Sequence, residues 1–212
     1  MTMSRLALAL GLALAANATR AASIEVQVRD AGGNPLGDTA VYAVPASGGS
    51  ETRYARAAVE QFDREFLPYV TVIQVGTTVT FPNRDPILHH VYSFSPAKPF
   101  EIKLYTGKSP SEVVFDKPGV VTLGCNIHDW MVAYIVIVPT PFFGRTDGSG
   151  NLRLRELPAG AYEVRAWHPQ QRAAAQAQSV VLDAAGTVRT SFEIDSASRK
   201  PRFKPPLDRL KY

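Results

Sequence analysis

The sequence predicts an all-β protein built from packed sheets. Runs that are rich in β-branched residues, or that alternate between apolar and polar residues, recur along the chain and are separated by turn residues. A single cysteine excludes an intrachain disulfide, so the sheets must be stabilised by packing. A mature chain of roughly 190 residues is long enough for one or two hydrophobic cores.

The first residues have the features of a secretory signal peptide. Arg5 supplies an early positive charge, an apolar run extends over residues 6–16, and small residues precede Ser23. The apolar run is shorter than the ~20 residues that a membrane-spanning helix needs. Cleavage fits at any of three small residues, which are Ala18, Ala21 and Ala22. We therefore expect a periplasmic or otherwise exported protein with a signal peptide over residues 1–22.

Charge argues against a nucleic-acid partner. Removal of residues 1–22 takes away Arg5 and Arg20 and no acidic residue, so the formal net charge falls from +4 to +2. Such a mildly basic protein lacks the strong positive field of a nucleic-acid-binding domain. The basic, proline-rich segment 196–212 is expected to be a solvated tail.

The first mature segment predicts two strands that need distant partners. Residues 24–29 and 39–44 alternate between apolar and polar around a turn at 30–35. Two strands alone cannot bury an apolar face in water. The expected partners lie between Thr146 and Ile194, where turns separate four candidate strands at 152–154, 162–167, 179–182 and 188–194.

These two segments resemble the carboxypeptidase-regulatory-like, transthyretin-like β-sandwich. The matching motifs are Val28-x-Asp30, Asn34-Pro35-Leu36, Thr146-Asp147-x2-Gly150 and Leu157-Pro158-Ala159-Gly160-x-Tyr162-x-Val164. The resemblance implies a small discontinuous sandwich over 23–50 and 140–195, with a second domain over 51–139 inserted in it or docked beside it. The alternative is one enlarged sandwich with these strands as additions.

The middle of the chain predicts further strands around one unusual loop. After a Gly/Ser linker at 45–50, strands are expected near 69–75, 79–81, 91–94, 120–123 and 132–138, with 95–110 as a loop over one edge. Between the last two strands lies Cys125-x2-His128-x2-Met131, which contains the only cysteine. Thiolate, imidazole and thioether are the ligands of blue-copper electron-transfer sites, which also need a second histidine.

That histidine is expected from the segment before the strand at 91–94. The run Asn83-x-Asp85-x3-His89-x-Val91, then Pro118-Gly119, then the cysteine loop, resembles the plastocyanin and amicyanin group of cupredoxins. The resemblance covers residues 60–139 and extends to exported cupredoxins of the methylamine-utilisation type, although no residue selects that pathway. It implies a Greek-key β-sandwich that holds one type 1 copper ion. The implied ligands are His89, Cys125, His128 and Met131.

The double histidine leaves the choice of ligand open. Spacing from Asn83 favours His89, as the resemblance implies. Strand parity argues for His90, because His90, Tyr92 and Phe94 share a face that looks more core-like than the face of His89. We predict His89 as the ligand and His90 as a supporting residue or an exposed one.

The resemblance also implies roles around the metal. Asn83 would join the two ligand loops by hydrogen bonds, and a backbone N–H near Asn126 or Asp85 would reach the Cys125 sulfur. His128 would come to the surface in an apolar patch that docks a partner. The patch would contain Leu88, Ile127 and Trp130. Alternatively, Trp130 packs on the loop.

Two classes of function follow from this ligand set. The first is a copper protein that carries single electrons between redox partners such as a c-type cytochrome or a dehydrogenase. The second is a copper-binding, copper-delivery or interaction protein. An enzyme is not expected, because no nucleophile with an oriented base is visible. His168, far from the ligand motifs, is expected to be structural.

Overall fold

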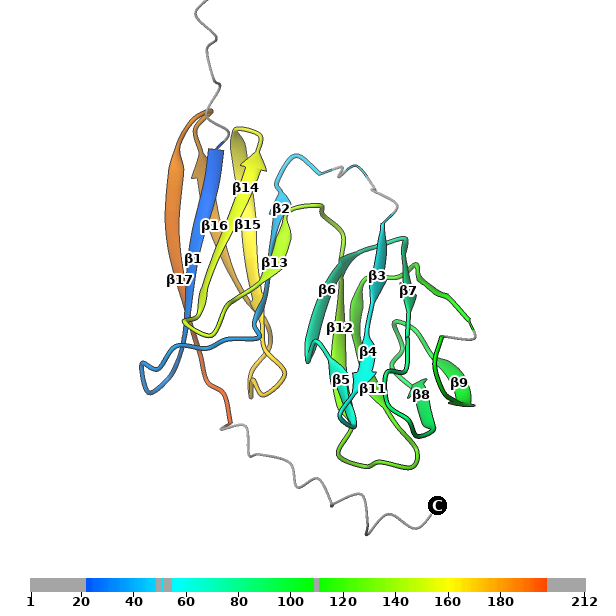
Figure 1. Ribbon diagram of the computed structural model, residues 1–212. Coiled ribbons are helices and arrows are strands. Elements are labelled where there is room, and N and C mark those ends of the chain that lie inside the picture. The colour runs from blue at the N-terminus through cyan, green and yellow to red at the C-terminus, as the bar shows by residue number, and fades with distance from the viewer. Residues whose placement is uncertain (1–21, 49–50, 52–54, 109–110, 198–212) are drawn as a thin grey trace, which may run out of the picture.

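The computed structural model describes residues 22–48, 51, 55–108 and 111–197. Within these ranges every regular element is a β-strand, which confirms the all-β class. No helix in this part of the chain has the length and apolar character to cross a membrane. The predicted signal peptide up to residue 21 and the tail from residue 198 lie outside the described residues. The strands form two sandwiches that lie side by side (Figure 1).

The first sandwich joins the beginning of the described chain to its end. One sheet has the order β14-β1-β17 and the other the order β13-β2-β15-β16. Strand β1 pairs antiparallel with β14 and parallel with β17. The strands are β1 (Ala22–Asp30), β2 (Ala40–Pro45), β13 (Phe143–Arg145), β14 (Asn151–Leu157), β15 (Gly160–Trp167), β16 (Gln176–Leu182) and β17 (Thr187–Ile194). Alternation in β1 directs Ile24, Val26 and Val28 into one core.

The second sandwich is built from the intervening chain. A sheet of order β6-β12-β11-β8-β9 packs on a sheet of order β10-β7-β3, and β4 and β5 form a separate hairpin. The strands are β3 (Arg56–Ala58), β4 (Glu60–Phe62), β5 (Glu65–Leu67), β6 (Val70–Gln74), β7 (Thr77–Thr80), β8 (His89–Ser93), β9 (Phe100–Tyr105), β10 (Val113–Phe115), β11 (Gly119–Gly124) and β12 (Val132–Val138). Cys125 and Met131 belong to its core.

Strand β12 is buried on both faces because it serves two cores. Its residues Ala133, Ile135 and Ile137 point into the second sandwich. The alternate residues Val136 and Val138 belong to a third cluster, which also contains Ala40 of β2. The valine-rich run from Val132 is therefore apolar throughout, since one face fills its own sandwich and the other packs on the first. That each sandwich is an independent domain stays a prediction.

One segment differs from the sequence-based expectation. The predicted loop at 95–110 contains β9, which pairs with β8 at the edge of the five-stranded sheet. Ile102 and Tyr105 of this strand are buried, whereas Glu101 and Lys103 are exposed. Charged residues are common on edge strands because one side of the ladder meets water. Of the residues that suggested a loop, Lys103 lies in β9, whereas Pro96 and Pro99 precede the strand.

Candidate metal centre

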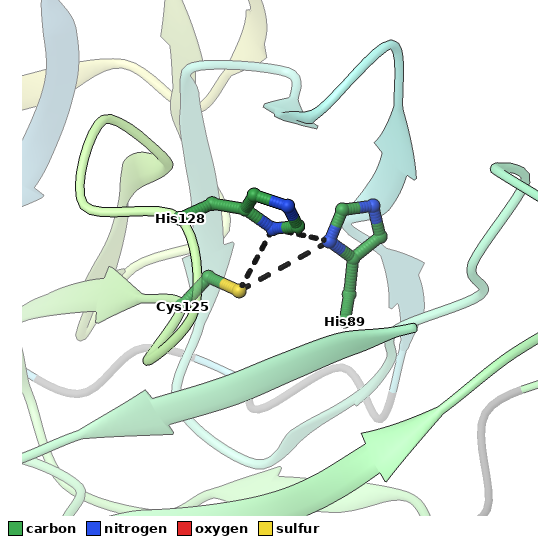
Figure 2. Close-up of side chains that lie close together, drawn as sticks. All are labelled: His89, Cys125 and His128. Carbon is green, nitrogen blue, oxygen red and sulfur yellow. Dashed lines mark hydrogen bonds between the residues drawn. The ribbon is translucent and has the colours of Figure 1, made fainter. Parts of the chain in front are cut away.

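Two loops at one end of the second sandwich bring three ligand-type side chains together. His89 is the first residue of β8, and Cys125 and His128 lie in the loop between β11 and β12. The Nδ1 atoms of the two histidines are 3.1 Å apart. The Cys125 Sγ atom lies 3.6 Å from Nδ1 of His128 and 4.0 Å from Nδ1 of His89. Figure 2 shows the three side chains pointing toward one another.

The three side chains are almost completely removed from solvent. His89 and His128 are both 0% exposed, and Cys125 is 3% exposed. Burial and, to a smaller extent, the nearby His89 lower the pKa of His128 to about 4. Burial also lowers the pKa of His89, although Asp85 opposes this shift. Both imidazoles are therefore neutral near pH 7, which is the form that binds a metal ion.

Backbone donors surround the cysteine sulfur. Burial raises the pKa of the Cys125 thiol, while N–H groups of His90, Ile127 and His128 that donate to the sulfur oppose that rise. Donors aimed at a sulfur stabilise its thiolate form. The expected backbone contact to the sulfur therefore comes from these residues, and the Asn126 side chain is exposed.

Met131 closes the cysteine loop. Its side chain is 1% exposed and belongs to the same core cluster as Cys125. Its backbone N–H donates to the carbonyl of His128 at 2.9 Å, which forms a tight turn before β12 begins. The Cys-x2-His-x2-Met spacing thus keeps three ligand-type residues in one short connection between adjacent strands.

Only one residue of the double histidine joins the cluster. Nε2 of His90 lies 2.9 Å from Oε1 of Glu101, and the His90 ring lies beside Tyr92 on the other face of β8. The parity argument for His90 is wrong, because His89, Val91 and Ser93 are buried whereas Phe94 is 85% exposed. The side-chain geometry thus agrees with the spacing from Asn83.

Asn83 shapes the loop that carries His89. Its Nδ2 donates to the carbonyls of Ile87 and Tyr105, both at 2.8 Å, and its Oδ1 accepts from the backbone N–H of Asp85 at 2.9 Å. These bonds fix the turn before β8 and attach it to β9. The resemblance implied a bridge to the cysteine loop, whereas these bonds lie within the His89 loop and to its neighbouring strand.

Asp85 contacts His89, and the sequence did not predict this contact. Its Oδ2 lies 2.7 Å from Nε2 of His89. Burial alone would raise the pKa of Asp85, but hydrogen bonds from Arg64, His89 and Asp63 outweigh it, so the pKa is lowered from its ordinary value of 3.8. The four-residue spacing from Asp85 to His89 is the only sequence signal for this pair, and in a loop such spacing fixes no geometry.

The expected docking residues are only partly exposed. Leu88 is 46% exposed, and Ile127 and Trp130 are half-buried. The Trp130 ring lies 5.1 Å from the His128 ring, and its Nε1 donates to the carbonyl of Arg64 at 3.1 Å. The expectation that His128 reaches the surface is wrong, since its side chain is buried. Trp130 packs on the ligand loop, so its indole lies next to the imidazole.

Comparison with known proteins gives structural neighbours only. No family model and no curated protein matches the sequence. The chain is similar to a copper-containing nitrite reductase from Thermus scotoductus, with 26% identity and a TM-score of 0.37, over 44% of this chain and 25% of that one. It is also similar to a purple cupredoxin from Nitrosopumilus maritimus, with 26% identity and a TM-score of 0.35, over 39% of this chain and 99% of that one. A reduced amicyanin variant matches with 16% identity and a TM-score of 0.36, over 48% of this chain and 99% of that one.

Cupredoxins are thus among its structural neighbours, as the sequence resemblance predicted. The roles of the site residues rest on their own geometry. Two Nδ1 atoms and one sulfur lie within 4.8 Å of one another, and a buried methionine belongs to the same core. Imidazole and thiolate suit copper, and a thioether is its usual weak fourth ligand in blue-copper sites. The donor set therefore fits a copper ion held by His89, Cys125, His128 and Met131.

Proposed function

We propose that the protein is an exported type 1 copper protein that carries single electrons between redox partners, without substrate chemistry of its own. The observation that supports this proposal is the buried convergence of His89, Cys125 and His128 within 4.8 Å. One bound copper ion would supply the chemistry by alternating between its cupric and cuprous forms. The chain supplies the neutral imidazoles, the thiolate and a packed β-scaffold.

The scaffold supports electron transfer by limiting movement of the ligands. Cu(I) and Cu(II) favour different geometries, so a site held by a packed core changes little when the electron arrives or leaves. His89 begins a strand, and the cysteine loop is closed by the Met131 turn. The N–H groups aimed at the Cys125 sulfur keep the thiolate oriented without movement of side chains.

Burial favours this function over copper delivery. A protein that hands its metal to a partner needs ligands that the partner can reach. Here both histidines of the cluster are 0% exposed. Electrons can cross a layer of side chains that an ion cannot, and the Trp130 ring beside His128 provides such a layer.

The proposed partner is a redox protein, such as a c-type cytochrome or a dehydrogenase, that docks over the metal end. Leu88, Ile127 and Trp130 would form the contact, and Phe62 of the β4–β5 hairpin adds an exposed ring. Partly exposed apolar residues clustered at one end are typical of contact surfaces. Export through the predicted signal peptide would place the protein with such partners in the periplasm.

The test is spectroscopy of the purified mature protein with one equivalent of Cu(II). We expect an intense blue thiolate-to-copper absorption band and a narrow copper hyperfine splitting in electron paramagnetic resonance. Both should be absent in Cys125→Ser, because the hydroxyl cannot replace the thiolate. An ordinary tetragonal copper signal that survives in Cys125→Ser would remove the cysteine from the site and contradict the proposal.

The double histidine offers a matched control. His89→Gln should lose the blue band, because it removes one Nδ1 from the cluster. His90→Gln removes the neighbouring imidazole, whose Nε2 faces Glu101, and keeps the backbone N–H that reaches the sulfur. It should therefore remain blue. The opposite result would make His90 the ligand.

A further inference from the structure

Asp85 accepts hydrogen bonds from two separate parts of the site, which are the His89 ring and the tip of the β4–β5 hairpin. Its Oδ2 lies 2.7 Å from Nε2 of His89 and accepts the backbone N–H of Arg64 at 2.8 Å. Its Oδ1 accepts the backbone N–H of Asp63 at 2.7 Å. The Asp85 side chain is only 9% exposed. A carboxylate this enclosed, with three donors placed around it, has little freedom to rotate.

The contact to Asp85 determines which nitrogen of His89 can bind a metal. An ionised carboxylate only accepts hydrogen bonds, so Nε2 of His89 must carry the proton of the neutral ring. The lone pair is then on Nδ1, the atom that faces Cys125 Sγ and Nδ1 of His128. The same bond also fixes the orientation of the ring.

The other two contacts hold the tip of the β4–β5 hairpin. Asp63 and Arg64 have φ angles of +49° and +57°, a left-handed conformation that is uncommon for residues other than glycine. Their N–H groups bind Asp85, while the Arg64 carbonyl accepts the indole N–H of Trp130. The hairpin tip is therefore attached to the loop of His89 and to the loop of Cys125 and His128.

We propose that Asp85 is a positioning residue, which fixes the Nδ1 lone pair of His89 toward the metal and ties the β4–β5 hairpin to the ligand loops. This role rests on the copper site proposed above. A carboxylate behind a ligating imidazole strengthens it as a donor, and loss of such a partner typically weakens metal binding about 10–100-fold. The hairpin contact links this tuning to the side chains that enclose the site.

The apoprotein tests the role without copper. Nitrogen-15 NMR of the histidine rings should find His89 protonated at Nε2 in the wild type. Asp85→Asn can place an amide N–H, which is a donor, against that nitrogen, so the population protonated at Nδ1 should rise. The backbone amide hydrogens of Asp63 and Arg64 should also exchange faster with solvent. Each of them donates to its own carboxylate oxygen of Asp85, and the asparagine side chain keeps only one oxygen acceptor. A wild-type ring protonated at Nδ1, or a ring unchanged in Asp85→Asn, would overturn the proposal.

Copper binding provides the second readout. In competition with a chelator, Asp85→Asn should bind Cu(II) about 10–100-fold more weakly than the wild type. The reduction potential of the bound copper should rise, because the weaker imidazole donor stabilises Cu(II) less, and this loss is larger for Cu(II) than for Cu(I). Glu60→Gln is the matched control. It also replaces a carboxylate by an amide, but in an exposed ion pair between the β4–β5 hairpin and Arg84. It should leave affinity and potential near the wild-type values.

The two proposals fail in different ways. A wild-type protein without a blue copper band would overturn the proposed function, while the tautomer of His89 in the apoprotein would still decide the role of Asp85. A blue wild type in which Asp85→Asn and Glu60→Gln bind copper equally well would leave the function standing and overturn the positioning role.

Discussion

The buried histidines give the apoprotein a predictable response to pH. His128 has a pKa of about 4 in the fold against an ordinary value of 6.5, and the pKa of His89 is also lowered, in both cases mainly by burial. At a pH between the folded and the unfolded pKa of each histidine, the unfolded chain binds more protons than the folded chain. The free energy of unfolding therefore rises with pH in this range. Stability is therefore complete above the unfolded pKa of 6.5 and declines as the pH falls toward 4.

Urea unfolding of the apoprotein should show lower stability at about pH 5 than at about pH 7. The lowered pKa of Asp85 acts in the same direction, but only as the pH approaches and passes below its ordinary value of 3.8. His128→Gln should flatten the dependence between about pH 5 and about pH 7, because it removes the most strongly shifted imidazole. A wild-type stability that is constant from about pH 5 to about pH 7 would contradict the burial of neutral rings.

Position 124, directly before the cysteine, requires glycine because the ring of Tyr92 on the neighbouring strand leaves no room for a side chain. Gly124 pairs with Tyr92, and a Cβ at position 124 would lie 2.8 Å from Cζ of that ring. Gly124→Ala should therefore displace Tyr92 and lower the free energy of unfolding by about 1–3 kcal/mol, the usual cost of overpacking. Denaturant unfolding measures this change, and the blue band should shift because Cys125 is the next residue.

A second glycine provides the control for that change. A Cβ added at Gly148 meets nothing within 4 Å, so Gly148→Ala should be nearly neutral. Tyr92→Ala combined with Gly124→Ala should recover part of the loss, because the double variant removes the clash. Equal losses in Gly124→Ala and Gly148→Ala would show that Tyr92 does not set the cost.

At the scale of single elements, the sequence predicted what local spacing encodes. The strand at 132–138 and the cysteine loop follow from a short stretch of chain, and three of the four predicted ligands lie in that loop. The choice between His89 and His90 was harder to predict from the sequence. Alternation holds along β8, since His89, Val91 and Ser93 are buried together, but the aromatic residues Tyr92 and Phe94 made the opposite face look like the core.

Other features of the site depend on contacts between distant residues. The donors to Asp85 are backbone groups of Asp63 and Arg64, which are 22 and 21 residues away. Any residue type offers a backbone N–H, so no motif reveals such a contact. The burial of His128 has a similar origin, since Trp130 is held over it by the carbonyl of Arg64. Sequence could identify the ligand types but not what covers them.

At the scale of the whole molecule, the two sandwiches meet through an aromatic cluster. Tyr134 on β12 lies 5.6 Å from Trp167 on β15 and 5.5 Å from Tyr69, and Gln170 donates to the Tyr69 hydroxyl at 2.6 Å. The opposite face of β12 packs against the core that contains Cys125 and Met131. One strand therefore connects the metal centre to the contact with the first sandwich.

This connection predicts how far copper stabilises the chain. Copper that binds only the folded state should raise the stability of the second sandwich by mass action. The first sandwich should share the gain only through its contacts with the second, which include the aromatic contact and the packing of Val136 and Val138 with Ala40. Hydrogen exchange of β1 and β17, measured with and without copper, should thus show added protection in the wild type.

Trp167→Ala should reduce that protection, because it removes the ring that packs on Tyr134. Val181→Ala alters an apolar residue of the first sandwich that is 72% exposed, so it should keep the wild-type response. If β1 and β17 gained the same protection in Trp167→Ala as in the wild type, coupling would have to run through other contacts. If they gained none even in the wild type, the first sandwich would unfold independently of the metal centre, and β12 would stabilise only its own core.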